Sequence, residues 1–129
     1  MKHIQEVAIE CADAKMMAQF WGTVLECPWG YQPDLGGAVD TGDMFLFFQD
    51  TPEGDLSAGN RLHLDVVADD MEAAAARAEE LGATRTGERF DDPEGGGYIT
   101  MRDPESNAFC FVAEPNGSWT KLLHGILSQ

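Results

Sequence analysis

The residues best suited to chemistry in this sequence lie on a short expected strand near its centre. Between residues 60 and 70 the side chains alternate in character, so that His63 and Asp65 share one face of that strand. A neutral imidazole can transfer protons or bind a metal ion, and Asp65 could orient it or bind a cationic ligand. The alternatives are a solvated rim position for Asp65 and a buried structural role for His63.

A helix is expected directly after this strand. Asp69 or Asp70 stands where a helix N-cap belongs, before the alanine-rich run from Met71 to Leu81, and Gly82 is available to end the helix. The spacing therefore predicts strand, cap and helix in immediate succession.

The same arrangement occurs earlier in the chain. Residues 7–11 form an expected strand and Asp13 its cap, and aligning Asp13 with Asp70 places Glu6 on His63. The chain therefore reads as a duplicated module, with Glu6 and His63 at equivalent positions. Apolar residues after Asp13 recur at helical spacing, which predicts a buried stripe made of Met17, Phe20, Trp21, Val24 and Leu25.

The remaining expected elements complete both modules. A turn or edge strand follows the first helix at residues 27–31, and residues 36–40 and 44–49 form a hairpin. The second strand of this hairpin is apolar on both faces and is therefore expected to be central. A polar loop at residues 50–59 separates the modules. Further strands are predicted near residues 84–90, 98–101 and 108–113.

Composition and charge exclude several classes of protein. A chain of 129 residues, 43% of them hydrophobic, can form one folded domain, and without a signal segment or an apolar run of membrane-spanning length it is expected to be cytoplasmic. The formal net charge of −15 disfavours nucleic acid and anionic membranes as partners and favours cationic small molecules. Cys11, Cys27 and Cys110 are widely spaced and odd in number, so they are expected to be reduced thiols.

Two motifs carry a resemblance to a known family. Residues 61–66 read Arg-Leu-His-Leu-Asp-Val, and residues 103–110 read Asp-Pro-Glu-Ser-Asn-Ala-Phe-Cys. Together with Ile-Glu-Cys-Ala-Asp at residues 9–13, they resemble the vicinal oxygen chelate superfamily, which includes glyoxalases, extradiol dioxygenases, and fosfomycin- and bleomycin-resistance proteins. The resemblance covers roughly residues 2–114 and is strongest to glyoxalase-like domains of unknown function.

This resemblance implies an α+β fold built from two βαβββ modules. The modules would span about residues 1–50 and 60–115 of a single domain at 1–115, each curling into a half-open barrel around a cavity, often within a homodimer. Residues 116–129 would form a C-terminal tail, whose amphipathic pattern allows a helix packed on the domain or on a partner subunit.

The resemblance also implies where a metal would bind. In metal-binding members the four ligand positions fall here on Glu6, on Phe47 or Gln49, on His63 and on Cys110. Only His63 is the expected residue, Glu6 is a plausible replacement, and Gln49 and Cys110 are weaker ligands. We therefore expect either no cofactor or a single divalent ion, namely zinc, nickel, iron or manganese. Cys110 otherwise reads as a small buried hydrophobe.

Two functions follow from the resemblance and the residues. The first is binding of a cationic or aromatic small molecule, as in bleomycin-resistance proteins, with ligand contacts from Trp29, Phe47, Gln49, Asp65 and Cys110. The second is a lyase or isomerase, with or without metal, in which Glu6 and His63 transfer protons. A domain that serves mainly as a dimer interface is a third reading. Other aromatic residues that could line the cavity are Trp21, Tyr31, Phe45, Phe90, Tyr98 and Phe109.

Overall fold

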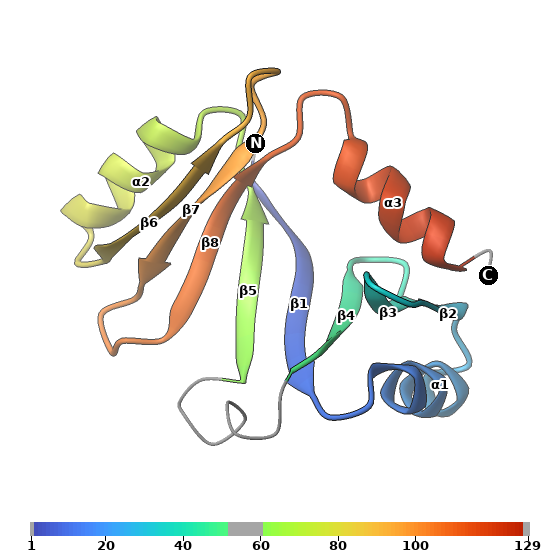
Figure 1. Ribbon diagram of the computed structural model, residues 1–129. Helices are drawn as coiled ribbons and strands as arrows, with labels where there is room; N and C mark the ends of the chain where they lie inside the picture. The colour runs from blue at the N-terminus through green and yellow to red at the C-terminus, as the bar shows by residue number, and fades with distance from the viewer. Residues whose placement is uncertain (1, 52–60, 128–129) are drawn as a thin grey trace. The chain divides into compact units, whose positions relative to one another are not determined.

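A computed structural model describes residues 2–51 and 61–127 of the chain (Figure 1). It confirms the expected α+β class with two βαβββ modules. The elements of the first module are β1 (His3–Cys11), α1 (Ala14–Leu25), β2 (Trp29–Gln32), β3 (Gly36–Asp40) and β4 (Phe45–Asp50). Those of the second are β5 (Leu62–Val67), α2 (Met71–Glu80), β6 (Thr84–Asp91), β7 (Gly97–Arg102) and β8 (Ala108–Ala113). A last helix, α3 (Ser118–Leu127), follows them.

The chain divides into two compact units. The first unit contains Glu6–Leu62 and Trp119–Gln129, and the second contains Met1–Gln5 and His63–Ser118. In the first unit the strand order is β2-β3-β4-β1, with β1 parallel to β4, so that β4 has the central place predicted for it. In the second unit the order β6-β7-β8-β5, with β5 parallel to β8, repeats this pairing.

Both module helices begin at the predicted aspartate caps. Asp13 Oδ1 accepts a hydrogen bond from the backbone N–H of Met16 at 3.0 Å, and Asp70 Oδ1 accepts one from Ala73 at 3.0 Å. Each carboxylate thus satisfies one of the backbone donors that a helix leaves open at its start. The sequence equivalence of Asp13 and Asp70 is therefore also an equivalence of structure.

The buried stripe predicted on α1 is wrong. The helix instead buries Ala14, Ala18 and Gly22 against the sheet. A Cβ added to Gly37 on β3 would lie 2.8 Å from the Cβ of Ala18, and one added to Gly22 would lie 2.5 Å from the Cβ of Trp29. Because the sheet comes this close to α1, no space remains for large side chains on the side of the helix that faces the sheet. Four residues of the predicted stripe are exposed, namely Phe20, Trp21, Val24 and Leu25.

The second module packs its helix more conventionally. Met71, Ala74 and Ala75 of α2 lie against a buried cluster that includes Met101 and Phe111. The face of β5 opposite His63 and Asp65 is only partly buried, because Leu62 and Leu64 are exposed. Ion pairs also connect α2 to β6, with Glu72 bound by the guanidinium groups of Arg85 and Arg89.

The C-terminal tail forms a helix that packs within the first unit. Leu123 and Ile126 of α3 are fully buried against Ala38, Phe45 and Phe47. The carbonyl oxygen of Ile126 passes so close to Gly30 on β2 that a Cβ there would lie 2.1 Å away. Glycine is therefore required at position 30 for α3 to reach the sheet.

The predicted polar loop at residues 50–59 lies almost entirely outside the described residues. In the part of the chain that is described, no helix has the length and apolar character needed to cross a membrane.

Candidate functional site

One predicted site residue of the first unit lies under α3. Glu6 is only 2% exposed, and its Oε1 accepts a hydrogen bond of 2.6 Å from the indole N–H of Trp119. The register of β1 with β4 places Glu6 beside Phe45, whose ring centroid is 5.1 Å from that of His124 on α3. We call this side of the first-unit sheet, with Glu6, Ala38, Phe45 and Phe47, the α3 face.

The two alternatives at the β4 ligand position have different surroundings. Phe47 is 3% exposed and meets Trp119 edge to face, with ring centroids 5.3 Å apart. Gln49 lies two residues further along the same strand and is exposed. Phe47 therefore contributes to the packing of α3, and Gln49 lies beyond that packing.

Trp29 does not lie beside Glu6 and Phe47. Two residues apart on β2, Trp29 and Tyr31 both belong to the cluster packed against α1, on the opposite side of the sheet from the α3 face. Trp29 fills the space left by Gly22. Its aromatic ring is therefore part of the helix-to-sheet core of the first unit.

The second unit carries a separate group of polar side chains on its sheet. His63 and Asp65 lie on β5, with the Nε2 of His63 3.7 Å from the Oδ1 of Asp65. The His63 side chain is 28% exposed and that of Asp65 is 13% exposed. Leu64 and Val66 alternate with them and point to the other face of β5, where Val66 packs in the cluster around α2. His63 and Asp65 therefore face away from α2.

Cys110 on β8 and Thr100 on β7 extend this group across the sheet. Strand register pairs Asp65 with Cys110 and Cys110 with Thr100. The Oγ1 of Thr100 and the Sγ of Cys110 are 3.4 Å apart, and either can donate the hydrogen bond. We call the surface formed by His63, Asp65, Thr100 and Cys110 the polar face.

Burial and negative charge keep the Cys110 thiol protonated. Burial is the main cause that raises the pKa of Cys110 to about 11, and the hydrogen bond with Thr100 acts in the opposite direction. The charges of Asp65 and of Glu88 on β6 raise this pKa further. A thiol with such a pKa is a weak nucleophile near neutral pH.

Two aromatic residues predicted for the cavity lie close to each other in the second unit. Phe90 on β6 and Tyr98 on β7 are paired in the strand register, with ring centroids 6.0 Å apart. Tyr98 lies two residues before Thr100 and therefore points to the same face of β7. Phe90 is 51% exposed. An exposed aromatic ring therefore lies near the polar face and can contact a ligand.

Three residues of these surfaces were missed from the sequence. The strand alternation that identifies His63 also places Thr100 on the polar face, so the sequence contained the information needed to predict its position. Glu88 lies within the irregularity in the register of β6, between Arg85 and Arg89, which periodicity does not locate. Trp119 was recognised only as part of an amphipathic tail, and its partner Glu6 is more than a hundred residues away.

The candidate metal ligands do not form a metal site. Among the described residues, no group of three or more His, Cys, Asp and Glu side chains is arranged to hold an ion. The Glu6 carboxylate already accepts a hydrogen bond from the indole N–H of Trp119. Cys110 would also have to lose a proton from a thiol of raised pKa. The residues present therefore do not fit the divalent ion that the resemblance allowed.

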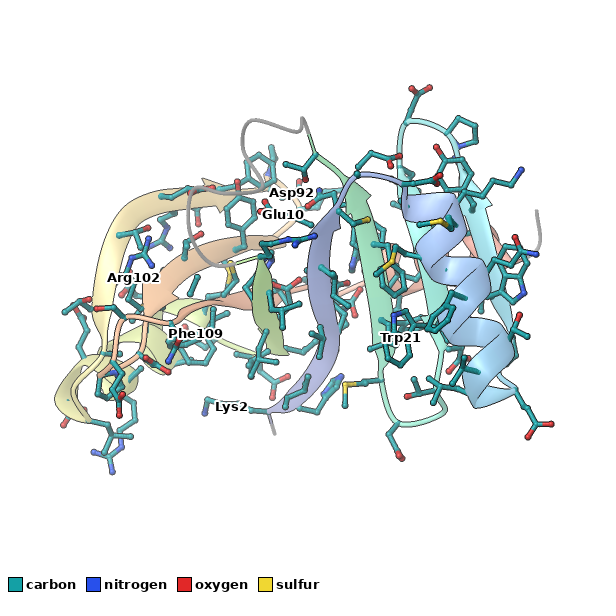
Figure 2. All side chains as sticks on the ribbon, turned by 90° about the horizontal axis from the view of Figure 1, so that it is seen from below. Lys2, Glu10, Trp21, Asp92, Arg102 and Phe109 are labelled. Carbon is teal, nitrogen blue, oxygen red and sulfur yellow. The ribbon has the colours of Figure 1, made fainter. Side chains whose placement is uncertain are left out.

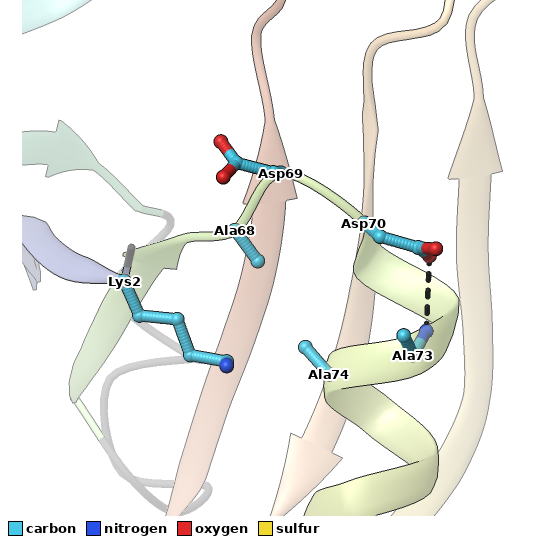
Figure 3. Close-up of a pocket in the computed structure, with 6 residues that line it drawn as sticks. All are labelled: Lys2, Ala68, Asp69, Asp70, Ala73 and Ala74. Carbon is cyan, nitrogen blue, oxygen red and sulfur yellow. Dashed lines mark hydrogen bonds between the residues drawn. The ribbon is translucent and has the colours of Figure 1, made fainter.

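A shallow pocket of about 230 Å³ lies at the start of α2 (Figure 3). Asp69 and Asp70 stand at its edge and the side chain of Lys2 extends into it. None of the residues predicted for the site lines this pocket. Asp70 is used as the helix cap, so we assign the pocket no role.

Comparison with known proteins identifies the family. A family model described as "Glyoxalase-like domain" matches residues 6–112. The chain belongs to this family. The resemblance to the vicinal oxygen chelate superfamily is thereby confirmed. No curated protein matches the sequence.

Solved structures share the fold of this glyoxalase-like domain at low sequence identity. A glyoxalase/bleomycin resistance protein/dioxygenase superfamily member from Vibrio splendidus 12B01 has 15% identity and a TM-score of 0.63, covering 88% of this chain and 100% of its own. A methylmalonyl-CoA epimerase from Streptomyces coelicolor, in complex with 2-nitronate-propionyl-CoA, has 15% identity and a TM-score of 0.62, covering 88% and 97%. At such identities the likeness shows the fold alone.

Proposed function

We propose that this glyoxalase-like domain binds a cationic small organic molecule on the polar face of its second unit. The observation that carries the proposal is the grouping of partly exposed polar side chains from three adjacent strands, on the side of the sheet away from α2. Ligand sites commonly combine a few convergent polar groups with apolar or aromatic walls. His63, Asp65 and Thr100 supply the polar groups, and Phe90 and Tyr98 supply the aromatic surface.

The charges around Cys110 favour a cation. Asp65 and Glu88 both act on this thiol and both raise its pKa, so they impose a negative potential on the polar face. The net charge of −15 adds a field of the same sign. A positively charged ligand would be attracted by both contributions, and its cation could also lie against an aromatic ring.

The cationic class can be tested with a defined set of probes. A panel of aromatic amines and benzyl quaternary ammonium compounds is compared with matched aromatic carboxylates by thermal shift and isothermal titration calorimetry. We expect the cations alone to bind, with an affinity that falls as salt is added because the attraction is screened. Equal binding of the carboxylates, or no binding of any cation, would contradict the proposal.

Two substitutions locate the binding surface. Asp65→Asn removes a partly buried charge and should weaken binding of the tightest cation roughly fivefold to tenfold. Glu88→Gln removes an exposed charge and should weaken it only about twofold. Glu105→Gln, which changes charge equally on an exposed turn, is the matched control and should leave the affinity unchanged.

A lyase or isomerase remains the second candidate, favoured by the His63–Asp65 pair. An acid 3.7 Å from the imidazole can orient it for proton transfer. The Glu6 part of this hypothesis has weaker support, because Glu6 already binds Trp119. If the chain is such an enzyme, His63→Gln should abolish the exchange of a carbon-bound proton of the bound ligand with deuterated water. The same variant should still bind that ligand.

A further inference from the structure

The outer side of α1 exposes an unusual number of large apolar side chains. Five of them are between 37% and 58% exposed on one helix of 12 residues, namely Met16, Phe20, Trp21, Val24 and Leu25. Phe20 and Trp21 meet edge to face with ring centroids 5.3 Å apart, and Figure 2 labels Trp21 on this helix. We call these five residues the α1 surface. Grouped apolar surface of this kind is typical of interaction sites.

The α1 surface is not a consequence of incomplete core packing. The side of α1 that faces the sheet is already filled by small residues, namely Ala14, Ala18 and Gly22. A Cβ added to Gly22 would lie only 2.5 Å from the Cβ of Trp29, so the helix cannot turn a larger side chain inward there. A large apolar side chain that stays this exposed gains only part of the free energy that full burial gives. Contact with another molecule would bury the remainder.

The apolar side of α1 begins at a carboxylate. Met16, Phe20 and Val24 follow one another at intervals of four residues and therefore lie along one side of the helix. Asp13, the exposed N-cap, precedes Met16 by three residues and so stands at the start of the same side. Lys15, the one charged residue within α1, comes one position before Met16 and points about 100° away from it around the helix axis. The lysine therefore lies off the apolar side, whereas Asp13 lies on it.

Two further carboxylates lie near the start of α1. Asp50 Oδ1 accepts a hydrogen bond of 2.8 Å from the backbone N–H of Ala14, and Asp50 Oδ2 accepts one of 3.2 Å from the hydroxyl group of Tyr31. Burial is the main cause that raises the pKa of this tyrosine, followed by Asp50, and the charges of Asp13 and Asp34 add to it, so both lie close by. All three aspartates are exposed. We call Asp13, Asp34 and Asp50 the acidic end of the α1 surface.

One guanidinium group lies in the same neighbourhood. The Nη2 of Arg61 donates a hydrogen bond of 3.3 Å to a backbone carbonyl oxygen of β1. Burial is the main cause that raises the pKa of Cys11, the charges of two members of the acidic end raise it further, and the charge of Arg61 lowers it. Three carboxylates thus stand against Arg61 and Lys15, so the acidic end keeps a net negative charge.

We propose that the α1 surface binds a basic amphipathic helix of another protein. The apolar stripe of that helix would cover Met16, Phe20 and Val24, and its lysine or arginine residues would meet the acidic end. Basic residues are favoured in the last turn of a helix, so the partner helix runs antiparallel to α1. Aromatic residues commonly dominate the energy of protein interfaces, and Phe20 and Trp21 have that role here. The site is independent of the ligand-binding proposal, which concerns the second unit.

Charge disfavours two other occupants of the α1 surface. In an antiparallel pairing of two copies of this chain, the acidic end of each would lie against the other's Glu26, the exposed C-cap of α1. The net charge of −15 on each copy adds to this repulsion. A membrane with anionic lipids would be repelled by the same carboxylates.

Fluorescence anisotropy with a labelled model peptide tests the site. The probe is a peptide of about 16 residues, long enough to be partly helical in water, with leucines at helical spacing and lysines concentrated in its second half. One comparison peptide has the same composition in scrambled order, and another has glutamate in place of lysine. We expect the ordered lysine peptide to bind the full chain about tenfold more tightly than either, or better. Equal binding of the scrambled peptide, or no binding of the ordered one, would overturn the proposal.

Two substitutions of exposed apolar residues locate the bound peptide. Phe20→Ser removes the centre of the α1 surface and should weaken binding of the lysine peptide about tenfold or more. Leu122→Ser, which makes the same kind of change at an exposed position of α3, is the matched control and should leave the affinity unchanged. Circular dichroism checks that both variants are folded. Equal affinities of the two variants for the peptide would show that the peptide binds elsewhere and that the proposal is wrong.

A second pair of variants tests the acidic end. Asp13→Asn combined with Asp34→Asn removes two of its charges and keeps the fold, because asparagine also caps helices and tolerates the φ of 73° at position 34. This double variant should bind the lysine peptide about fivefold more weakly at low salt, and the difference should shrink as salt is added. Asp43→Asn combined with Glu105→Gln removes two exposed charges elsewhere and should leave the affinity unchanged. If both double variants lose affinity equally, the acidic end does not recognise the peptide and the proposal fails.

Phe20→Ser also distinguishes the other occupants. If the wild-type chain dimerises in sedimentation equilibrium and Phe20→Ser does not, a second copy covers the α1 surface. If the wild-type chain floats with phosphatidylcholine vesicles and Phe20→Ser does not, a lipid surface covers it. Either result would contradict a protein helix as the partner.

Discussion

The two modules share one backbone plan but use opposite surfaces. In both, an aspartate caps the helix and the first strand runs parallel to the last. On the sheet side away from its own module helix, the first unit is covered by α3 and buries Glu6, whereas the second unit presents the partly exposed His63 and Asp65. The outer sides of the helices also differ, because that of α1 is apolar and that of α2 is charged.

This contrast shows what a duplicated sequence pattern determines. Caps and strand alternation fix the backbone, but each face of a strand can change its residues without changing the pairing. Glu6 and His63 stand at equivalent positions, yet one is enclosed with an indole and the other lies beside a carboxylate. We therefore assign packing to the first sheet face, and the ligand binding that we propose belongs to the second.

The largest expected difference between the two faces lies in their aromatic residues. Phe47→Ala removes a ring buried between β4 and α3 and should lower the free energy of unfolding by about 3–5 kcal/mol. Phe90→Ala removes a half-exposed ring from the second unit and should lower it by about 1 kcal/mol or less. Urea denaturation followed by circular dichroism gives both values.

One outcome of these measurements would contradict the difference between the two faces. Equal losses of stability in Phe47→Ala and Phe90→Ala would mean that α3 contributes little to the first unit. The distinction between a packed face and an open face would then fail.

A smaller effect is expected from the hydrogen bond between Trp119 and Glu6. Trp119→Phe keeps an aromatic ring but removes the indole donor from a buried carboxylate, so it should cost about 1–3 kcal/mol. In a Glu6→Gln background the same change should cost less, because an uncharged amide loses less than a carboxylate. The difference between the two costs, measured as a double-mutant cycle by urea denaturation, gives the coupling. Identical costs in both backgrounds would show that the bond contributes nothing specific.

The sequence alone was sufficient for features that depend on local chemistry. The sequence predicts Asp13 as one cap and Asp69 or Asp70 as the other, because capping needs only a short polar side chain at a fixed offset. The burial of α1 was mispredicted because the rule treats large apolar residues as core, and here Ala18 and Gly37 pack the backbones together instead. The enclosure of Glu6 was missed because it depends on Trp119, whose approach is a tertiary contact without a local signal.

The smallest predicted effect concerns Cys110 and serves to test the open face. Because the pKa of this thiol is raised to about 11, the folded state keeps its proton after the unfolded chain has lost it, from about pH 8.5 upward. Its contribution to stability is therefore complete below pH 8.5 and is lost as the pH rises towards 11.

Compared with Cys110→Ala, the wild type should lose roughly 1 kcal/mol more stability between pH 7 and pH 9.5. Urea denaturation at both pH values measures this difference, and iodoacetamide should alkylate folded Cys110 at pH 8 far more slowly than the urea-unfolded chain. Rapid alkylation with no such pH dependence would mean that the thiol is accessible and ionised, and hence that Cys110 is not held protonated by burial in the sheet of the second unit.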